Sequence, residues 1–271
     1  MKNLPQFLIL LLLPLLQVHA QKKEIGKTLA VWEINNGSIK LDKGTVEDNK
    51  AKVYWEYMKK VLPNEFLDRY VVAFRLYTDG KEEDLGGMSP LDESNKNWQI
   101  ELDYIDNDLT SNDSSMLEDM DHTIIHEFGH LLSLNIQQVE PTEDKYQDDE
   151  RGYLTTEGYA KKDSYLGLYV AEFWKGDLLL EWDEIAMKGS RRRQKFLLGF
   201  YDNYQDQFIN DYAVESPEED FAESWSYFIL NEKNEATSIK DKKINFFYQF
   251  PDLVAYRTEM RQHLKSLNMD D

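Results

Sequence analysis

The sequence contains no cysteine among its 271 residues, which excludes disulfide scaffolds, thiol nucleophiles, iron–sulfur clusters and Cys-ligated zinc. Positive charge is also scarce, because 31 Lys and Arg residues stand against 51 Asp and Glu residues. The formal charge of −20 argues against a nucleic-acid partner, since phosphate binding requires a basic surface. Any metal ion in this protein must therefore be held by His, Asp or Glu side chains.

Long hydrophobic runs are confined to the N-terminus. Lys2 precedes an apolar run over residues 4–16, and Val18 and Ala20 then supply small residues at the two positions that a signal peptidase reads. The run is short for a transmembrane helix, and polar residues follow it. We therefore predict a cleaved signal peptide over residues 1–20 and a secreted mature protein, either extracellular or periplasmic. Loss of the single positive charge of Lys2 changes the formal charge from −20 to −21.

The rest of the chain has the composition and the patterning of one globular domain. The full sequence is 41% hydrophobic and 13% aromatic, which is enough to build a substantial core. Alternation and β-branched residues predict strands in the N-terminal part, and helical periodicity dominates after Met116. We predict strands over residues 28–34, 38–41, 70–78 and 98–105, a loop over 81–96, and helices over 47–62, 117–135, 164–174, 178–188, 192–208, 217–231, 239–249 and 252–267. This order indicates an α+β fold in a single domain over residues 21–271, with no stable membrane insertion after signal cleavage.

The residues from His126 to His130 form an H-E-x-x-H motif. Apolar neighbours predict a helix that crosses the core, on which residues four apart share one face. Two imidazoles so placed can both reach one metal ion at about 2.0–2.1 Å, the zinc–nitrogen distance. Glu127 lies one step around the helix, where it can contact a water on the metal without binding the metal itself. A hydrogen-bonded pair of core histidines is the alternative interpretation.

A third metal ligand is available in the helix that is predicted to begin after Ser216. Glu219 and Glu223 are four residues apart, so one carboxylate can bind the metal while the other orients a ligand histidine through its second ring nitrogen. The alternative is a capping box, in which Glu219 only accepts a hydrogen bond from the Ser216 backbone N–H. Because the H-E-x-x-H motif lies upstream, we predict that His126, His130 and Glu219 bind the metal and that Glu223 orients a ligand.

These motifs resemble the catalytic core of gluzincin metallopeptidases, and in particular the anthrax lethal-factor-like group. In that group a Tyr seven residues before the ligand Glu assists catalysis, as Tyr212 and Glu219 are spaced here. The ligand Glu also precedes an aromatic-Ala-Glu step, which residues 221–223 match. Segments 122–126 and 211–220 further resemble exported zinc metallopeptidases of bacteria. The resemblance implies a zincin-like fold and a Zn²⁺ cofactor.

The resemblance covers about residues 95–232, and one departure falls inside it. The interval between His130 and Glu219 is longer than in the lethal-factor domain. The helices predicted between residues 160 and 208 therefore have no assigned role, and they could reshape the substrate cleft. The acidic connector over residues 137–157 is long, and such loops are often functional or mobile.

Together the motifs and the resemblance predict a secreted, monomeric, zinc-dependent endopeptidase that acts on a peptide or protein substrate. Two neutral imidazoles and one carboxylate leave zinc a position for water, whose pKa the cation lowers. Glu127 takes the proton as general base and passes it to the leaving amine. Tyr212 donates to the oxyanion of the tetrahedral intermediate. By analogy with the fold class, the strand at 98–105 is expected to bind an extended peptide by edge pairing.

Two other functions remain open at this stage. One is a catalytically silent zincin-fold module that binds zinc or a partner, and the other is a zinc hydrolase that acts on a non-peptide amide. Intact Glu127 and Tyr212 argue against the silent module, since a retired site would tolerate their loss. His122 lies about 6 Å along the helix axis from His126, so it is not counted among the ligands. The cluster at residues 191–193 is interpreted as a basic helix face.

Overall fold

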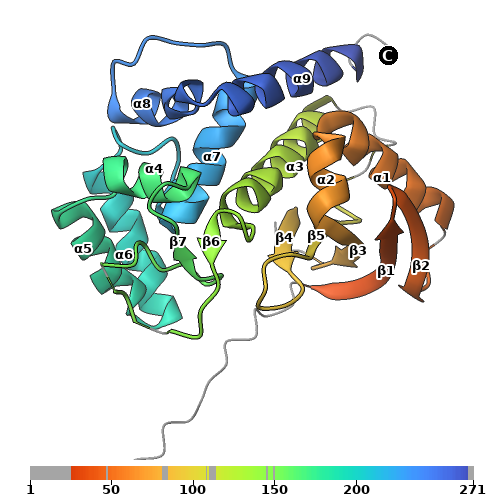
Figure 1. Cartoon of the computed structure of the whole chain (residues 1–271), viewed down its shortest axis with the longest axis horizontal. Coiled ribbons are helices and arrows are strands. Elements are labelled where there is room, and N and C mark those ends of the chain that lie inside the picture. Colours follow the sequence, from red (N-terminus) through yellow and green to blue (C-terminus); the bar gives the residue numbers. More distant parts are fainter. Residues whose placement is uncertain are drawn as a thin grey trace, which may run out of the picture.

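The N-terminal part of the molecule forms a mixed sheet, and the C-terminal part is mostly helical. The computed structural model of the chain describes residues 26–46, 48–80, 85–107, 109, 114–144, 146–148 and 150–267. The predicted signal peptide, residues 1–20, lies outside this part of the chain. In Figure 1 the strands between residues 27 and 103 lie on one side of a central helix, and the helices between residues 165 and 203 lie on the other. This arrangement confirms the predicted α+β class.

The main sheet of the described residues has five strands in the order β2-β1-β3-β5-β4. β3 and β5 run parallel, and the other neighbouring pairs are antiparallel. The strands are β1 (Lys27–Asn35), β2 (Ser38–Gly44), β3 (Val71–Thr78), β4 (Gly86–Pro90) and β5 (Trp98–Asp103), and a separate small pair is β6 (Val139–Glu140) with β7 (Tyr159–Ala160). The predicted turn between β1 and β2 is confirmed, because Asn36 and Gly37 both have positive φ, as a tight hairpin requires.

Two expectations for the sheet are wrong, and both concern its edge. Residues 81–96 were expected to form a loop, but they contain β4, which pairs with β5 and leaves β5 in the interior of the sheet. The edge beside the central helix is therefore β4, and β5 is buried on both faces rather than half-buried. The glycines that suggest a loop permit a close approach instead, since a Cβ at Gly86 would lie 2.7 Å from Thr123 Cγ2.

The predicted helices are all present, and one further helix follows Pro63. Leu62 and Pro63 are the two residues that separate the preceding helix from α2, and Pro63 is itself the N-cap of α2. The helices are α1 (Asp48–Val61), α2 (Asn64–Tyr70), α3 (Ser114–Leu134), α4 (Tyr165–Phe173), α5 (Asp177–Ala186), α6 (Ser190–Asn203), α7 (Pro217–Leu230), α8 (Ile239–Asn245) and α9 (Pro251–Leu267), with short 3₁₀ turns at Tyr212–Val214 and Phe246–Gln249. None of the described helices combines the length and apolar character needed to cross a bilayer.

The crossing of α3 and α7 is the contact that positions the predicted site. Gly129 lies at this crossing, where an added Cβ would be 3.0 Å from Ala222 Cα and 3.2 Å from a carbon of the Trp225 ring. A larger residue at 129 would therefore push the two backbones apart. The small residue inside the H-E-x-x-H motif thus lets two segments about ninety residues apart pack side by side.

Candidate metal centre

Helix α3 presents the motif side chains from a buried position. Ile124, Ile125 and Phe128 are fully buried and fix the helix against the core. His126 and Glu127 are themselves only 5% and 8% exposed, so the core face and the polar face of α3 are both enclosed. The apolar neighbours of the motif therefore set the rotation of the helix, as the sequence predicts.

Helix α7 begins at the predicted residues, but the Glu219 side chain does not form the predicted alternative, a capping box. The Ser216 hydroxyl accepts a hydrogen bond from the Glu219 backbone N–H at 3.2 Å, and Pro217 is the first helical residue. The Glu219 carboxylate is turned toward α3, where its Oε2 lies 3.1 Å from His126 Nε2. The backbone of Glu219 thus takes part in the cap while its side chain belongs to the cluster with the histidines.

Three ligand atoms from α3 and α7 form a nearly equilateral triangle. His126 Nε2 lies 3.1 Å from His130 Nε2, and Glu219 Oε2 lies 3.1 and 3.2 Å from these two nitrogens. Ligand atoms at about 2.0–2.1 Å from a tetrahedral zinc ion are about 3.3 Å apart, so the triangle has close to the size that zinc requires. Two imidazoles and one carboxylate are also ligands that zinc accepts. These three residues form a group that could hold a metal ion.

Glu223 contacts the other nitrogen of the first histidine. Its Oε1 lies 2.8 Å from His126 Nδ1, and its Oε2 accepts a hydrogen bond from Asn210 Nδ2 at 2.7 Å. A carboxylate in this position favours a proton on Nδ1 and leaves the Nε2 lone pair directed toward the other ligand atoms. His122, whose Nε2 lies 3.6 Å from Glu223 Oε2, contacts the support and not the three ligand atoms. Asn210 has no motif of its own and was missed by the sequence analysis.

The electrostatics of the metal-free cluster favour a bound cation. Burial opposes the charged form of the His126 imidazole, but hydrogen bonds and charges from Glu219 and Glu223 outweigh it and raise the pKa of His126 to about 10. Burial also opposes the Glu219 anion, yet His130 and His126 together hold the pKa of Glu219 well below its ordinary value. The carboxylates therefore remain anionic and hold a proton on the imidazole, and a divalent ion can take the place of that proton.

The candidate centre opens into a cleft of about 670 Å³. Glu127, His130, Glu219 and Tyr212 line this cleft. Tyr212 is 51% exposed, and its ring centroid lies 5.7 Å from that of His126. The edge strand β4 contributes the opposite wall through Gly86, Gly87 and Met88. The structure thus brings every predicted site residue to one place, with Glu127 and Tyr212 on the open side and Glu223 behind His126.

Several cleft residues were missed because they come from the segments without an assigned role. The Tyr153 hydroxyl donates to Glu218 Oε2 at 3.2 Å, and both residues line the cleft. Arg193, interpreted from the sequence as part of a basic helix face, also lines the cleft and donates from an NH2 group to the Glu215 carbonyl at 2.8 Å. No local motif marks these positions, because the packing of α5, α6 and the connector places them there.

A second acidic group among the described residues comprises Asp79, Asp103 and Asp106. The Asp103 carboxylate is fully buried and accepts backbone N–H groups of Asp79, Ile105 and Asp106 at 2.9, 2.6 and 3.0 Å. These bonds brace the loop that follows β5. We therefore interpret this group as a loop support, in contrast to the triangle of ligand atoms at the cleft.

An α+β core in which an H-E-x-x-H helix crosses a helix that supplies a carboxylate is the architecture of a zinc metallopeptidase. The chain belongs to the family described as "Putative zinc-binding metallo-peptidase", whose model matches residues 48–265. This match spans the sheet from β3 to β5 and both helices of the candidate centre. No curated protein and no solved structure matches the chain. Membership in this family supports a zinc-binding peptidase with peptide or protein substrates.

Proposed function

We propose that the protein is a secreted zinc endopeptidase of the gluzincin type. His126, His130 and Glu219 are its metal ligands, and Glu223 orients His126. The observation that carries this proposal is the triangle of ligand atoms, with sides of 3.1–3.2 Å, at the mouth of the cleft. The signal sequence predicted over residues 1–20 supports export.

A zinc ion bound here supplies a Lewis acid, which polarises the scissile carbonyl and lowers the pKa of water. Glu127, on the cleft side of α3, accepts the proton of the attacking water and transfers it to the leaving amine. Tyr212 donates its hydroxyl proton in a hydrogen bond to the developing oxyanion, because its ring lies beside His126 on the open side. The chain's own side chains thus provide one proton carrier and one hydrogen-bond donor.

The edge strand β4 supports an extended substrate in this cleft. Its residues Gly86, Gly87 and Met88 line the cleft on the side opposite α7. Among the described residues β4 is the last strand of the sheet, so its outer edge is where an extended peptide would add backbone hydrogen bonds. The sequence predicts edge pairing with a peptide for the strand at 98–105. Because β5 is an interior strand, we assign this peptide-binding role to β4 instead. A peptide held along an edge can continue past the centre in both directions, which favours cleavage within a chain.

The direct test combines metal analysis with digestion of a mixed peptide library. The parent protein should bind zinc at one ion per chain and cleave internal peptide bonds, and chelation should stop cleavage until zinc is restored. Glu127→Gln should retain zinc and lose roughly 10²–10⁴-fold in turnover, the usual contribution of a general base. Stoichiometric zinc without any cleavage favours the silent binding module. Cleavage of non-peptide amides alone favours the other hydrolase, and undiminished cleavage by Glu127→Gln contradicts the mechanism.

A further inference from the structure

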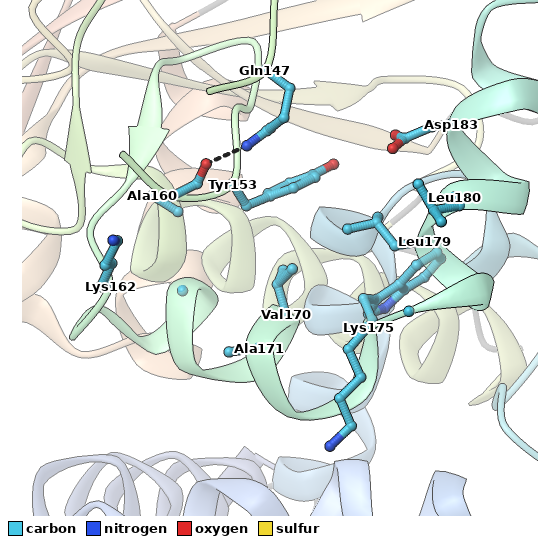
Figure 2. Close-up of a pocket in the computed structure, with 14 residues that line it drawn as sticks. Gln147, Tyr153, Ala160, Lys162, Val170, Ala171, Lys175, Leu179, Leu180 and Asp183 are labelled. Carbon is cyan, nitrogen blue, oxygen red and sulfur yellow. Dashed lines mark hydrogen bonds between the residues drawn. The ribbon is translucent and has the colours of Figure 1, made fainter. Parts of the chain in front are cut away.

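A second cavity, of about 580 Å³, lies between α4, α5 and the connector that precedes β7. Its volume is in the range of sites that bind small ligands. Figure 2 shows the side chains of Tyr153, Val170, Leu179 and Leu180 around this hollow. The buried Trp174 also lines the cavity. Apolar side chains from α4, α5 and the connector thus form a large part of the lining of this pocket.

This cavity adjoins the catalytic cleft through shared walls. Tyr153 lines both cavities, and its hydroxyl donates to Glu218, the residue that precedes the predicted ligand Glu219. On α5, Trp182 lines the cleft while its neighbour Asp183 lines the second cavity. The cleft and this pocket therefore lie next to each other, with Tyr153 in the wall of both.

The pocket also exposes apolar surface that a ligand would cover. Leu180 is 63% exposed although it lines a hollow, and Ala171 on the facing helix is also exposed. By contrast, Val170 and Trp174 at its base are only 5% and 1% exposed. Exposed apolar side chains gathered over a buried apolar base are typical of a ligand-binding hollow.

We propose that this cavity is a specificity subsite that receives a large aliphatic or aromatic side chain of the peptide substrate. This inference rests on the proposed peptidase function and adds a substrate class to it. The wall that the pocket shares with the cleft at Tyr153 selects a substrate side chain as the occupant, because a peptide bound in the cleft lies next to this pocket. The helices that lengthen the interval between His130 and Glu219 thereby acquire a role, which is to select the peptide that is cut.

The test compares two identical substitutions at exposed leucines. Leu180→Glu places a charge at the pocket, whereas Leu198→Glu places the same charge on α6 at a residue that is 51% exposed and does not line the cavity. The zinc-loaded parent should prefer Phe, Leu or Met at one fixed position of the peptide library. Leu180→Glu should lower kcat/KM for those peptides by about tenfold or more. The kcat/KM for peptides that carry Ala at that position should change little. Leu198→Glu should match the parent on both.

A filling variant tests the cavity without adding charge. Ala171→Trp projects a large side chain from an exposed position into the hollow, and Glu172→Trp places the same side chain at the next exposed position, outside the lining. Ala171→Trp should abolish the preference for large apolar residues, and Glu172→Trp should preserve it. If both tryptophan variants, or both glutamate variants, lose the preference for large apolar residues to the same extent, the proposed subsite is overturned.

A binding measurement separates failure of the subsite from failure of the proposed function. In the Glu127→Gln background, fluorescein-labelled peptides with Phe or Ala at the selected position should differ about tenfold in Kd, and Leu180→Glu should remove this difference. Cleavage by the parent without any apolar preference overturns the subsite and leaves the peptidase intact. Apolar peptides that bind at the pocket and are never cut leave the subsite standing and overturn the peptidase. Absence of both cleavage and binding overturns both.

Discussion

Helix α7 carries two carboxylates on adjacent residues, Glu219 half-buried and Asp220 fully buried, and each pairs with cationic groups in a different way. Glu219 points to α3 and the cleft, where its partners are two histidines. Asp220 points instead toward α8 and the end of α4. Its Oδ2 lies 2.7 Å from Lys243 Nζ and accepts a hydrogen bond from Trp174 Nε1 at 2.7 Å. Adjacent helical residues differ in direction by about 100°, so one helix serves both clusters.

The difference lies in whether the cation can be exchanged. Lys243 and Asp220 are both fully buried, so the ammonium group is a fixed part of the core. Burial raises the pKa of Asp220 and lowers that of Lys243, which shows how strongly both charges are desolvated. The Glu219 cluster instead faces a cleft and binds a proton that a metal ion can replace. Buried charge by itself therefore does not identify a functional site, whereas an exchangeable cation next to open space does.

Removal of the ligand carboxylate is expected to have the largest effect. Glu219→Ala leaves two histidines, too few protein ligands for a catalytic zinc site. Zinc affinity should fall by more than the roughly 10–100-fold that changes to supporting residues cost, and peptide cleavage should fall below detection. Zinc titration with a competing chelator measures this effect. Unchanged affinity in Glu219→Ala would show that another group holds the metal.

Removal of the fixed cation should affect stability and leave the metal site intact. Lys243→Met leaves Asp220 buried without its cation, which should lower the free energy of unfolding by about 3–5 kcal/mol. Urea denaturation measures the loss, and zinc affinity of the folded variant should stay within about twofold of the parent. Lys242→Met, at the exposed neighbouring position, is the matched control. An equal effect in the two variants would refute a structural role for the pair.

Loss of the supporting carboxylate should have an intermediate effect. Glu223→Gln keeps the shape of the side chain but removes the charge that holds His126 Nδ1 at 2.8 Å. Zinc affinity should fall by roughly 10–100-fold, because such partners orient the ligand and raise its basicity. The exposed Glu232→Gln serves as the control, since its side chain is 85% exposed. A loss no greater than that of the control would remove Glu223 from the site.

The smallest expected effect is the change in zinc affinity for each unit of pH, which follows from the titration of His126. Because the pKa of His126 is raised to about 10 from 6.5, its stabilisation of the folded protein is complete below about pH 6.5 and is lost as pH rises toward 10. Zinc must displace this proton, so zinc affinity should rise by up to about tenfold per pH unit in the same window. Calorimetric titration in buffers of different ionisation enthalpy measures the proton released. Zinc affinity that does not change between pH 6.5 and 9 would contradict this linkage.

The comparison also explains which parts of the site could be predicted from the sequence. The spacing of His126 and His130 on one helix is a local property, and helical geometry places them together. Ser216 and the apolar neighbours on α7 likewise locate the helix that carries Glu219. That the two helices meet depends on Gly129, whose role as the crossing point emerges only when Ala222 is packed against it.

The missed features share one physical cause, which is that their position depends on distant packing. Gly86 resembles a loop residue in the sequence, but its missing side chain lets an edge strand approach Thr123 on α3. Tyr153 and Arg193 come from segments that carry no motif, and the cleft is formed only when these segments fold over it. Local periodicity therefore predicts the helices and the ligands, while the walls of the cleft follow from tertiary structure.

A crystal of the zinc-loaded protein, with diffraction measured at the zinc absorption edge, tests the central claim most directly. The account predicts one strong anomalous peak about 2.0–2.2 Å from His126 Nε2, His130 Nε2 and Glu219 Oε2. No peak between these atoms, or a peak at Asp103 instead, would contradict it.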